Sequence, residues 1–326
     1  GLRLVYLSPW DMHDERYGTD EYNDYFCNQL TELLTNYGEI FEVWFDGAKG
    51  SNAKKFEYDW QRYYDLIRKL QPKANIAICG PDIRWVGNEG GKSRKSEYSV
   101  VPCALREADR IMALSQQDEN QASSLQKYNQ MDEDLGSRKI LEKNAYICWF
   151  PAEVDVSIRK GWFFHEKDNR NSKSAKKLFK IYLNSVGNNC TLLLNIPPTP
   201  QGEIHKKDAK NLKKLGSMIN NITANPIVYN ELGELTKDNG VLDFDFNDTR
   251  KVKYVVLQED IAKSQRVEIF DLYIKKANGK YKRVYKGTVI GSKKIINLKG
   301  KKAKGIRFVI RQSRSNPVIK SIGIYE

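Results

Sequence analysis

The chain has 326 residues, of which 40% are hydrophobic, 11% aromatic and 29% charged. This length and composition exclude a disordered, collagen-like or coiled-coil protein and leave room for about two domains with buried cores. No apolar run approaches the roughly 20 residues that a membrane-spanning helix needs, so we expect no membrane span.

The net charge of +13 is distributed unevenly along the chain. Residues 222–326 contain 22 Lys and Arg against 11 Asp and Glu, so most of the excess lies in the last third. A basic segment can bind nucleic acid, yet this one has neither a basic helix nor the aromatic strand of an RNA-binding module. We therefore expect no nucleic-acid partner and interpret its lysine clusters as solvated strand ends and turns.

Five cysteines and three histidines are scattered along the chain. The cysteines include no C-x-x-C pair, which argues against a zinc site and against a disulfide framework. We expect them to be small buried hydrophobic residues. The histidines stand far apart, which weakens any histidine-rich metal site or His-triad mechanism.

Strand and helix patterns alternate over the first two thirds of the chain. Short apolar runs predict buried strands at residues 4–7, 41–45, 75–79, 146–150 and 191–196. Apolar residues at helical spacing predict helices at residues 22–37, 60–70, 178–186 and 212–219. The polar stretch 116–134 predicts a long loop or a poorly packed helix. Alternating strands and helices are typical of a parallel β-sheet covered by helices.

The pattern changes after Ile222. Short alternating runs predict strands at residues 241–246, 252–258, 266–275, 281–285, 294–298, 305–310 and 318–325. Regular short strands without helices are typical of an antiparallel β-sandwich. We therefore expect two domains, residues 1–222 and residues 223–326.

In parallel α/β folds, functional side chains lie where the strands end. Here the predicted strand ends carry carboxylates and tryptophans, whereas Ser–His and Cys–His pairs do not recur. Two carboxylates from different strands, with aromatic walls, suit glycosidic bond cleavage. Strand-end acids also serve plain structural roles, so the residue types leave both readings open.

Five segments resemble the α-L-fucosidases of glycoside hydrolase family 29: VWFDGA (43–48), GPDIRWVGNEGG (80–91), DLGSRK (134–139), WFPAEVDVSIRKGWFFH (149–165) and LLLNIPPTPQGEIH (192–205). The similarity is closest to the branch whose acid/base glutamate lies in a GNE segment. It covers residues 1 to about 222, and the last third also resembles the β-sandwich of that branch. The resemblance implies an α/β protein: an irregular (β/α)8-like catalytic barrel, then an antiparallel, carbohydrate-binding-like β-sandwich.

Family members carry two further strands upstream, with a His-Trp-Gly and a His-His segment that bind fucose. Nothing in this chain matches those segments, and His13 lies in a different context. The chain resembles the family from about the third strand onward. We therefore expect an incomplete barrel with a partial pocket, as in a truncated or split chain.

The resemblance implies two catalytic residues. Asp46, at the end of VWFD, would be the nucleophile, and Glu89, in GNE, would be the general acid/base. Each has a structural alternative, because Asp46 could cap the following helix and Glu89 could be a solvated loop acid.

Four further residues are candidates for binding the sugar. Trp44 stands two residues before Asp46 on the same strand face and would line the fucose pocket, with core filling as the alternative. Arg84 would bond a fucose hydroxyl or the nucleophile, or form a structural ion pair. Trp10 and Trp162 are weaker pocket candidates.

The resemblance implies a retaining exo-α-L-fucosidase that removes terminal, α1,3- or α1,4-linked fucose from glycans. Its partners would be fucosylated oligosaccharides, and no metal or organic cofactor is implied. A bacterial periplasmic or extracellular location is expected, and the cytoplasm stays open. The alternative is a non-catalytic, glycan-binding remnant of such an enzyme.

Overall fold

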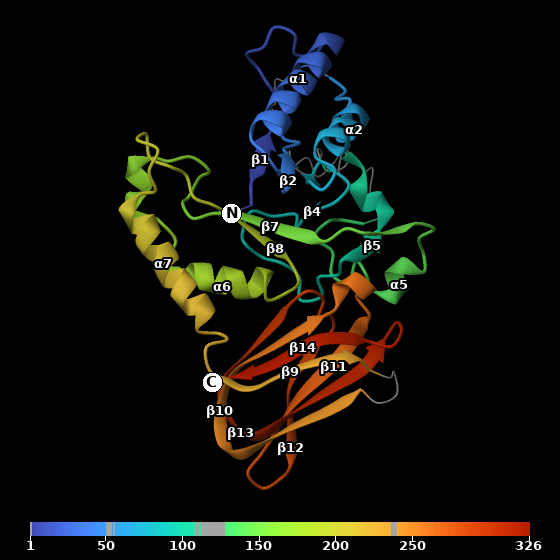
Figure 1. The fold of residues 1–326 in the computed structure, drawn as a ribbon, viewed down its shortest axis with the longest axis vertical. Coiled ribbons are helices and arrows are strands. Elements are labelled where there is room, and N and C mark those ends of the chain that lie inside the picture. The colour runs from blue at the N-terminus through green and yellow to red at the C-terminus, as the bar shows by residue number, and fades with distance from the viewer. Residues whose placement is uncertain (1, 50–53, 55, 109–110, 112–127, 236–239) are drawn as a thin grey trace. The chain divides into compact units, whose positions relative to one another are not determined.

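The computed structural model describes residues 2–49, 54, 56–108, 111, 128–235 and 240–326, and Figure 1 shows its elements in chain order. Of the stretch 116–134, for which the sequence predicts a loop or a poorly packed helix, residues 116–127 lie outside the described part of the chain. The chain divides into two compact units. The first comprises Gly1–Gly87, Val101–Asp132 and Leu141–Pro151. The second comprises Asn88–Val100, Glu133–Ile140 and Ala152–Glu326.

The first unit is built on a parallel sheet of three strands in the order β1-β2-β3. Its elements in chain order are β1 (Leu4–Leu7), α1 (Asp20–Asn36), β2 (Glu42–Phe45), α2 (Trp60–Leu70) and β3 (Asn75–Ile78). The sequence predicts all five, with ends that differ by at most two residues. Gly38 follows α1 with a φ of 76°, a conformation that glycine adopts without strain.

The helices of the first unit cover one face of this sheet. The ring of Phe45 on β2 lies 6.0 Å from Phe26 of α1 and 6.2 Å from Tyr63 of α2, between ring centroids. Successive side chains of a strand point to opposite faces. Because Phe45 points toward the helices, Trp44 and the residue that follows Phe45 face away from them.

Short elements complete the first unit. They are β4 (Arg84–Trp85), β5 (Val100–Pro102), a 3₁₀ turn (Cys103–Arg106) and β6 (Ile147–Trp149). Helix α5 (Arg138–Leu141) belongs to the second unit except for its last residue. Strand β6 confirms the strand predicted at residues 146–150, whereas β4 and β5 were not predicted. Three of the cysteines, Cys27, Cys79 and Cys190, are buried as expected, while Cys103 and Cys148 are half-buried.

In the second unit, two parallel strands lie against two helices. Strand β7 (Ala152–Ser157) pairs with β8 (Thr191–Asn195), and a 3₁₀ turn (Glu166–Arg170) and α6 (Ala175–Ser185) stand between them in sequence. Helix α7 (Lys206–Asn220) follows, and its Leu215 packs with Leu178 of α6 and Ile158 after β7. The sequence predicts β8 and both helices. It misses β7, because the carboxylates that suggest a loop there, Glu153 and Asp155, are buried inside the unit.

The rest of the second unit is an antiparallel sheet of six strands in the order β12-β11-β13-β10-β14-β9 (Figure 1). The strands are β9 (Pro226–Glu234), β10 (Val241–Glu259), β11 (Val267–Lys275), β12 (Tyr281–Gly287), β13 (Lys294–Ser313) and β14 (Val318–Tyr325). One contiguous apolar cluster takes buried residues from β10, β11, β13 and β14. We call these six strands the C-terminal sheet; they confirm the antiparallel β architecture expected for this region.

Two pairs of strands that the sequence predicts as separate each form one continuous strand in the structure. The runs 241–246 and 252–258 belong to the single strand β10, and the runs 294–298 and 305–310 to β13. The β10–β13 pairing shifts register between Asp245 and Arg250, where residues 247–251 are all exposed. A strand segment exposed on both faces carries no apolar alternation, so the sequence suggests a break where the chain continues.

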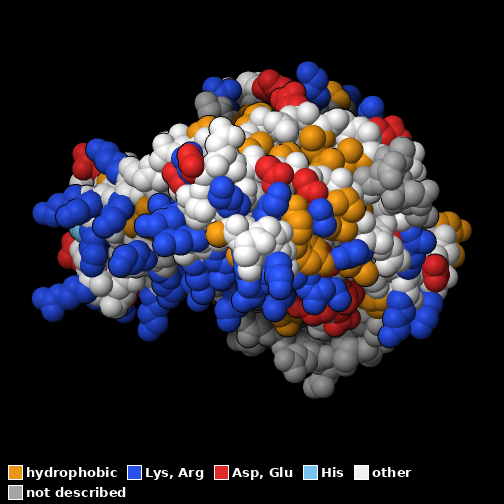
Figure 2. Space-filling view, turned by 90° about the horizontal axis from the view of Figure 1, so that it is seen from below, with side chains coloured by type: hydrophobic (Ala, Val, Ile, Leu, Met, Phe, Trp, Pro, Cys, Tyr) orange, Lys and Arg blue, Asp and Glu red, His pale blue; other side chains and the backbone are white. Residues whose placement is uncertain are grey.

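The excess positive charge lies at the surface of the C-terminal sheet, as expected. Figure 2 shows Lys and Arg side chains gathered toward the left and lower part of the view. Among the lysines of residues 222–326 that the structure describes, only Lys294 is buried. Within the same described ranges, no helix is both long and apolar enough to cross a membrane.

A buried carboxyl in the first unit makes stability depend on pH. Glu42 is 1% exposed, and burial raises its pKa from 4.5 to about 7. Since the folded state then binds the proton more tightly than the unfolded state, this stabilisation is complete below about pH 4.5 and is lost as the pH rises through about 7. The free energy of unfolding of Glu42→Gln, measured relative to that of the unaltered protein, should therefore rise by roughly 3 kcal/mol as the pH rises from about 4.5 to above 7.

Urea unfolding at low, intermediate and neutral pH measures this difference. Glu32→Gln, at an exposed position of α1, is the matched control and should track the unaltered protein at every pH. A stability difference for Glu42→Gln that stays constant with pH would contradict the prediction.

Candidate active site

Trp44 and Asp46 lie on the face of the first unit's sheet that points away from the helices. Trp44 is buried within β2, and Asp46 is half-buried directly after that strand. Asp46 Oδ1 accepts a hydrogen bond from the backbone N–H of Ala48 at 2.8 Å. The next described helix, α2, is capped by Asp59 instead, so Asp46 does not serve as its cap.

Tyr6 of β1 completes this arrangement. It stands opposite Trp44 in the parallel register, and the two rings stack with centroids 5.3 Å apart at 25°. The Tyr6 hydroxyl donates a hydrogen bond to Asp46 Oδ2. The carboxylate thus accepts donors on both oxygens, and such bonds are strongest when the acceptor is charged.

Sequence reasoning missed Tyr6, although a signal was present. Strands β1 and β2 are each four residues long, and in their parallel pairing the third residues, Tyr6 and Trp44, lie opposite each other. Once these two strands are taken as neighbours, Tyr6 and Trp44 fall on one face next to Asp46. The order of the strands, which the sequence does not state, was the missing information.

Arg84 and Trp10, two of the predicted sugar-binding residues, differ in burial, and the backbone of each donates a hydrogen bond. Arg84 is 0% exposed, and its backbone N–H donates to the Pro151 carbonyl at 2.8 Å. Full burial favours the structural alternative for its guanidinium. Trp10 is half-buried in the segment after β1, where its backbone N–H donates to Ser8 Oγ at 3.3 Å.

The charge of Arg84 acts on a neighbouring thiol of the same unit. Burial, together with a hydrogen bond between its thiol and that of Cys103, raises the pKa of Cys148 to about 12. The positive charges of Arg106 and Arg84 oppose this shift and do not overcome it. The Cys148 thiol is therefore protonated at neutral pH and is a poor nucleophile.

Glu89 belongs to the second unit and stands exposed in a short turn. The side chain of Asn88 closes the turn: its Oδ1 accepts from the N–H of Gly90 and its Nδ2 donates to the Lys92 carbonyl, both at 3.0 Å. Asp46 and Glu89 thus lie in different units, and a separation of about 5–5.5 Å between their carboxyls stays a prediction.

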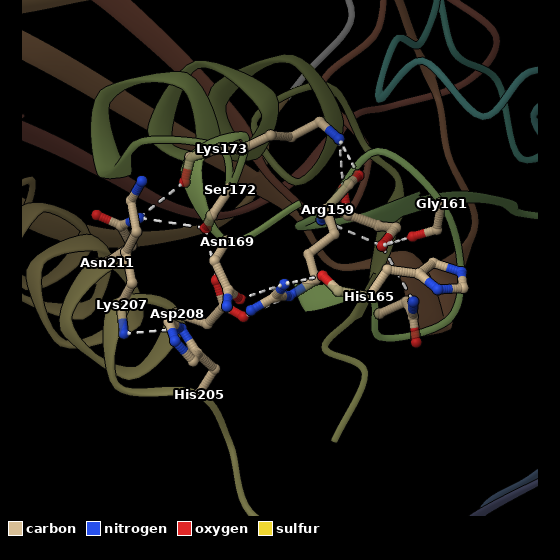
Figure 3. A network of polar contacts seen from close by, with 12 residues as sticks. Arg159, Gly161, His165, Asn169, Ser172, Lys173, His205, Lys207, Asp208 and Asn211 are labelled. Carbon is tan, nitrogen blue, oxygen red and sulfur yellow. Dashed lines mark hydrogen bonds and ion pairs between the residues drawn. The ribbon is translucent and has the colours of Figure 1, made fainter. Parts of the chain in front are cut away.

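A buried ion pair lies at the start of the loop that carries Trp162, and Figure 3 shows its two residues, Arg159 and Asp208. Arg159 Nε donates to Asp208 Oδ2 of α7 at 2.8 Å, and both side chains are fully buried. Arg159 Nη1 also donates to Asn169 Oδ1 at 2.9 Å, and Ser172 Oγ donates to Asp208 Oδ1 at 2.5 Å. Because removing one partner of such a pair leaves an uncompensated buried charge, the loss of either residue should destabilise this part of the unit.

Residues at the ends of β7 and β8 also form hydrogen bonds with the backbone of this loop. Asn195 Nδ2 donates to the Trp162 carbonyl at 2.8 Å and to Ser157 Oγ at 3.1 Å. Ser157 Oγ donates to the Gly161 carbonyl at 2.7 Å. The Trp162 side chain is 36% exposed, so a fixed backbone presents a partly exposed aromatic ring.

Sequence reasoning did not select Asp208, which lies in the first turn of α7 and reads as an ordinary acidic residue at a helix N-terminus. Over the described ranges of the chain, no group of three or more His, Cys, Asp or Glu side chains is placed to hold a metal ion.

Comparison with known proteins places these residues in a family. A model of the α-L-fucosidase family matches residues 5–223. The α-L-fucosidase 1 of Arabidopsis thaliana is 34% identical over an alignment that covers 100% of this chain and 66% of that relative. The chain therefore spans slightly less than two thirds of the length of this relative.

Solved structures agree. A Bacteroides ovatus crystal structure assigned to the α-L-fucosidases is 44% identical, with a TM-score of 0.86 over 98% of this chain and 54% of that one. A glycoside hydrolase 29 family member from an unknown rumen bacterium is 34% identical, with a TM-score of 0.80 over 100% of this chain and 58% of that one. The matched segments include Tyr6, Trp44, Asp46 and Glu89. The chain belongs to the α-L-fucosidase family, glycoside hydrolase family 29, as its motifs indicate.

Proposed function

We propose that this protein is a retaining exo-α-L-fucosidase that hydrolyses terminal α1,3- or α1,4-linked fucose from glycans. The observation that carries the proposal is the Asp46 carboxylate, which follows β2 in a family-matched segment, beside the stacked rings of Tyr6 and Trp44. Residues 1–222 would form the catalytic domain and residues 223–326 the β-sandwich domain. The substrates would be fucosylated oligosaccharides outside the cytoplasm.

In the first step, an Asp46 carboxylate oxygen attacks the anomeric carbon of fucose. A covalent bond forms between that oxygen and the carbon, and the glycosidic C–O bond breaks. Glu89 gives its proton to the departing oxygen, so the aglycone leaves as a neutral alcohol. The donors on both oxygens of Asp46 orient the carboxylate for this attack.

In the second step, water replaces the enzyme at the anomeric carbon. The Glu89 carboxylate takes a proton from the water, whose oxygen attacks the carbon and releases Asp46. Each displacement inverts the anomeric centre, so the product retains the configuration of the substrate. The apolar faces of Trp44 and Tyr6, together with Trp10 and Trp162, would pack against the sugar rings.

Replacing the nucleophile should abolish turnover. Asp46→Asn keeps the size of the side chain and removes the charge that attacks the anomeric carbon, so hydrolysis of an aryl α-L-fucoside should fall by roughly a thousandfold or more. Asp248→Asn, at an exposed position of β10, should leave the rate unchanged. An unaltered protein that binds fucosides without hydrolysing any would instead favour the non-catalytic alternative.

Replacing Glu89 should have an effect that depends on the leaving group. Glu89→Ala should slow the hydrolysis of an unactivated phenyl fucoside by roughly a hundredfold to ten-thousandfold. Cleavage of the glycosidic bond of an activated nitrophenyl fucoside should slow much less, because only the phenol leaving group needs a proton. Equal losses on both substrates would count against Glu89 as the acid/base.

Azide separates the two roles by stereochemistry. With Glu89→Ala, azide replaces water in the second displacement and should give α-L-fucosyl azide, since the centre inverts twice. With Asp46→Ala, azide occupies the space of the carboxylate and should give β-L-fucosyl azide by a single inversion. The anomeric configuration of each product, read by NMR, tests both assignments.

The Tyr6 hydroxyl should matter for attack rather than for protonation. Tyr6→Phe keeps the ring that stacks on Trp44 and removes one donor to Asp46, a loss that corresponds to about tenfold to a hundredfold in kcat/KM. The loss should be similar for phenyl and nitrophenyl fucosides. Tyr37→Phe, at an exposed position after α1, is the control; a Tyr6→Phe enzyme with unaltered kinetics would refute this role.

A further inference from the structure

The turn that presents Glu89 has a fixed geometry. Besides the two hydrogen bonds of Asn88, it contains Gly91 with a φ of +70°, and a Cβ built at this glycine would lie 3.0 Å from Ile181 of α6. A side chain at residue 91 would therefore be strained and crowded. The turn rests on α6, and its exposed residues are Glu89, Gly90 and Lys92.

The chain that follows this turn is tied to the C-terminal sheet by three side chains. Lys294 Nζ donates to the Lys95 carbonyl at 3.2 Å. Thr288 Oγ1 and Ser96 Oγ share a hydrogen bond of 2.7 Å. Gln265 Oε1 accepts from the backbone N–H of Ser99 at 3.0 Å. Lys294 begins β13, while Thr288 and Gln265 lie next to the ends of β12 and β11.

Asn189 also links the chain that follows the Glu89 turn to the C-terminal sheet. Its Nδ2 donates to the Glu97 carbonyl at 2.9 Å and to Ser99 Oγ at 3.1 Å. Its Oδ1 accepts from the N–H of Ser292, just before β13, at 2.8 Å. The backbone φ of +66° at Asn189 is one that asparagine tolerates better than most residues. The bridge leaves no room for a side chain at Gly291, where a Cβ would lie 2.1 Å from Asn189 Oδ1.

Lys294 is an unusual residue for such an attachment. It is 2% exposed, and its ammonium also donates to Asn188 Oδ1 at 2.8 Å. Burial lowers its pKa to about 8, so holding the charged form inside the protein costs stability at neutral pH. The other described lysines of residues 222–326 avoid this cost by lying at or near the surface.

A second family-matched segment is tied to the same sheet. Arg138 Nε donates to both carboxylate oxygens of Glu268 on β11 at 2.9 Å, and Arg138 Nη2 donates to the Ser313 carbonyl of β13 at 3.0 Å. Arg314 in turn donates to the Gly136 carbonyl. The sheet thus holds residues 95–99, which follow the GNEGG motif, and residues of the DLGSRK motif itself, so its contacts are not limited to its own core.

We propose that the C-terminal sheet is a positioning element for the general acid/base, with Lys294, Gln265 and Asn189 fixing the segment that presents Glu89. This inference rests on the proposed function, since it gives the sheet a part in proton transfer. Lys294, Gln265 and Asn189 are positioning residues, because they act on Glu89 through the backbone of residues 95–99. Misplacing a catalytic group by about 1 Å can cost a hundredfold in rate.

The kinetic test uses Lys294→Met in the full-length protein. Methionine keeps the apolar stem and removes both hydrogen bonds. We expect kcat/KM on an unactivated phenyl α-L-fucoside to fall by at least about tenfold, and on an activated nitrophenyl fucoside much less, which is the pattern expected for Glu89→Ala. Lys301→Met, at an exposed position of the same strand, should leave both rates unchanged. Equal losses on the two substrates, or no loss, would overturn the proposal.

Gln265→Leu provides a second variant in case Lys294→Met does not fold. It removes the acceptor for the Ser99 N–H at a site 2% exposed, and the same selective loss on the phenyl fucoside is expected. Equal losses of kcat/KM on the two substrates, or no loss, in this variant would also overturn the proposal.

Hydrogen exchange tests the attachment without relying on activity. In Lys294→Met, the backbone amides of residues 94–99 should exchange faster than in the unaltered protein, while those of β7 and β8 should not change. Unchanged exchange at residues 94–99 would refute the attachment. An unaltered protein that hydrolyses no fucoside would refute the proposed function, whereas an active enzyme indifferent to Lys294→Met would refute only this inference.

Discussion

The alternation of side chains along β2 is the constraint on which the position of Asp46, the proposed nucleophile, depends. Phe45 packs among the rings of α1 and α2, and this burial of apolar surface decides which face of the strand each neighbour takes. Trp44 and Asp46 then point the other way, toward Tyr6. A slip of one residue would place the carboxylate among the aromatic rings of the helices, where an unpaired charge is costly. The packing of Phe45 therefore orients Asp46 as firmly as the hydrogen bonds that Asp46 accepts.

Elements with local signals were predictable from the sequence, and elements defined by distant contacts were not. Helices α1 and α2 carry apolar residues at helical spacing, and their ends are marked by Gly38 and Asp59. Strand β7 lacks such marks, because Glu153 and Asp155 are buried although their chemistry suggests a loop. The two long strands β10 and β13 were each split in the prediction. Their exposed, polar middle segments carry no apolar pattern, and only pairing across the sheet keeps them extended.

The candidate site shows the same division. Asp46 and Glu89 could be proposed from the sequence because they lie inside continuous motifs, which can be recognised without knowing the fold. Tyr6 was missed because its partner Asp46 is 40 residues away, and Lys294 because it contacts a carbonyl 199 positions earlier in the chain. Each of these contacts needs a strand order or a sheet packing that no local window contains. Sequence reasoning thus reaches the proposed reacting groups more readily than the residues that contact them.

The chemistry of Lys294 indicates that the attachment of the Glu89 segment serves positioning more than stability. A leucine or methionine at the start of β13 would add to the apolar core without the cost of burying an ammonium group. It would also leave the Lys95 carbonyl and Asn188 Oδ1 without the donor that each now has, and a buried acceptor without a donor costs about 1–3 kcal/mol. An apolar residue is compatible with several positions of the segment, whereas the ammonium group satisfies these two oxygens only where both lie within hydrogen-bond distance of it. Directional bonds of this kind select one conformation among those that apolar burial alone would permit.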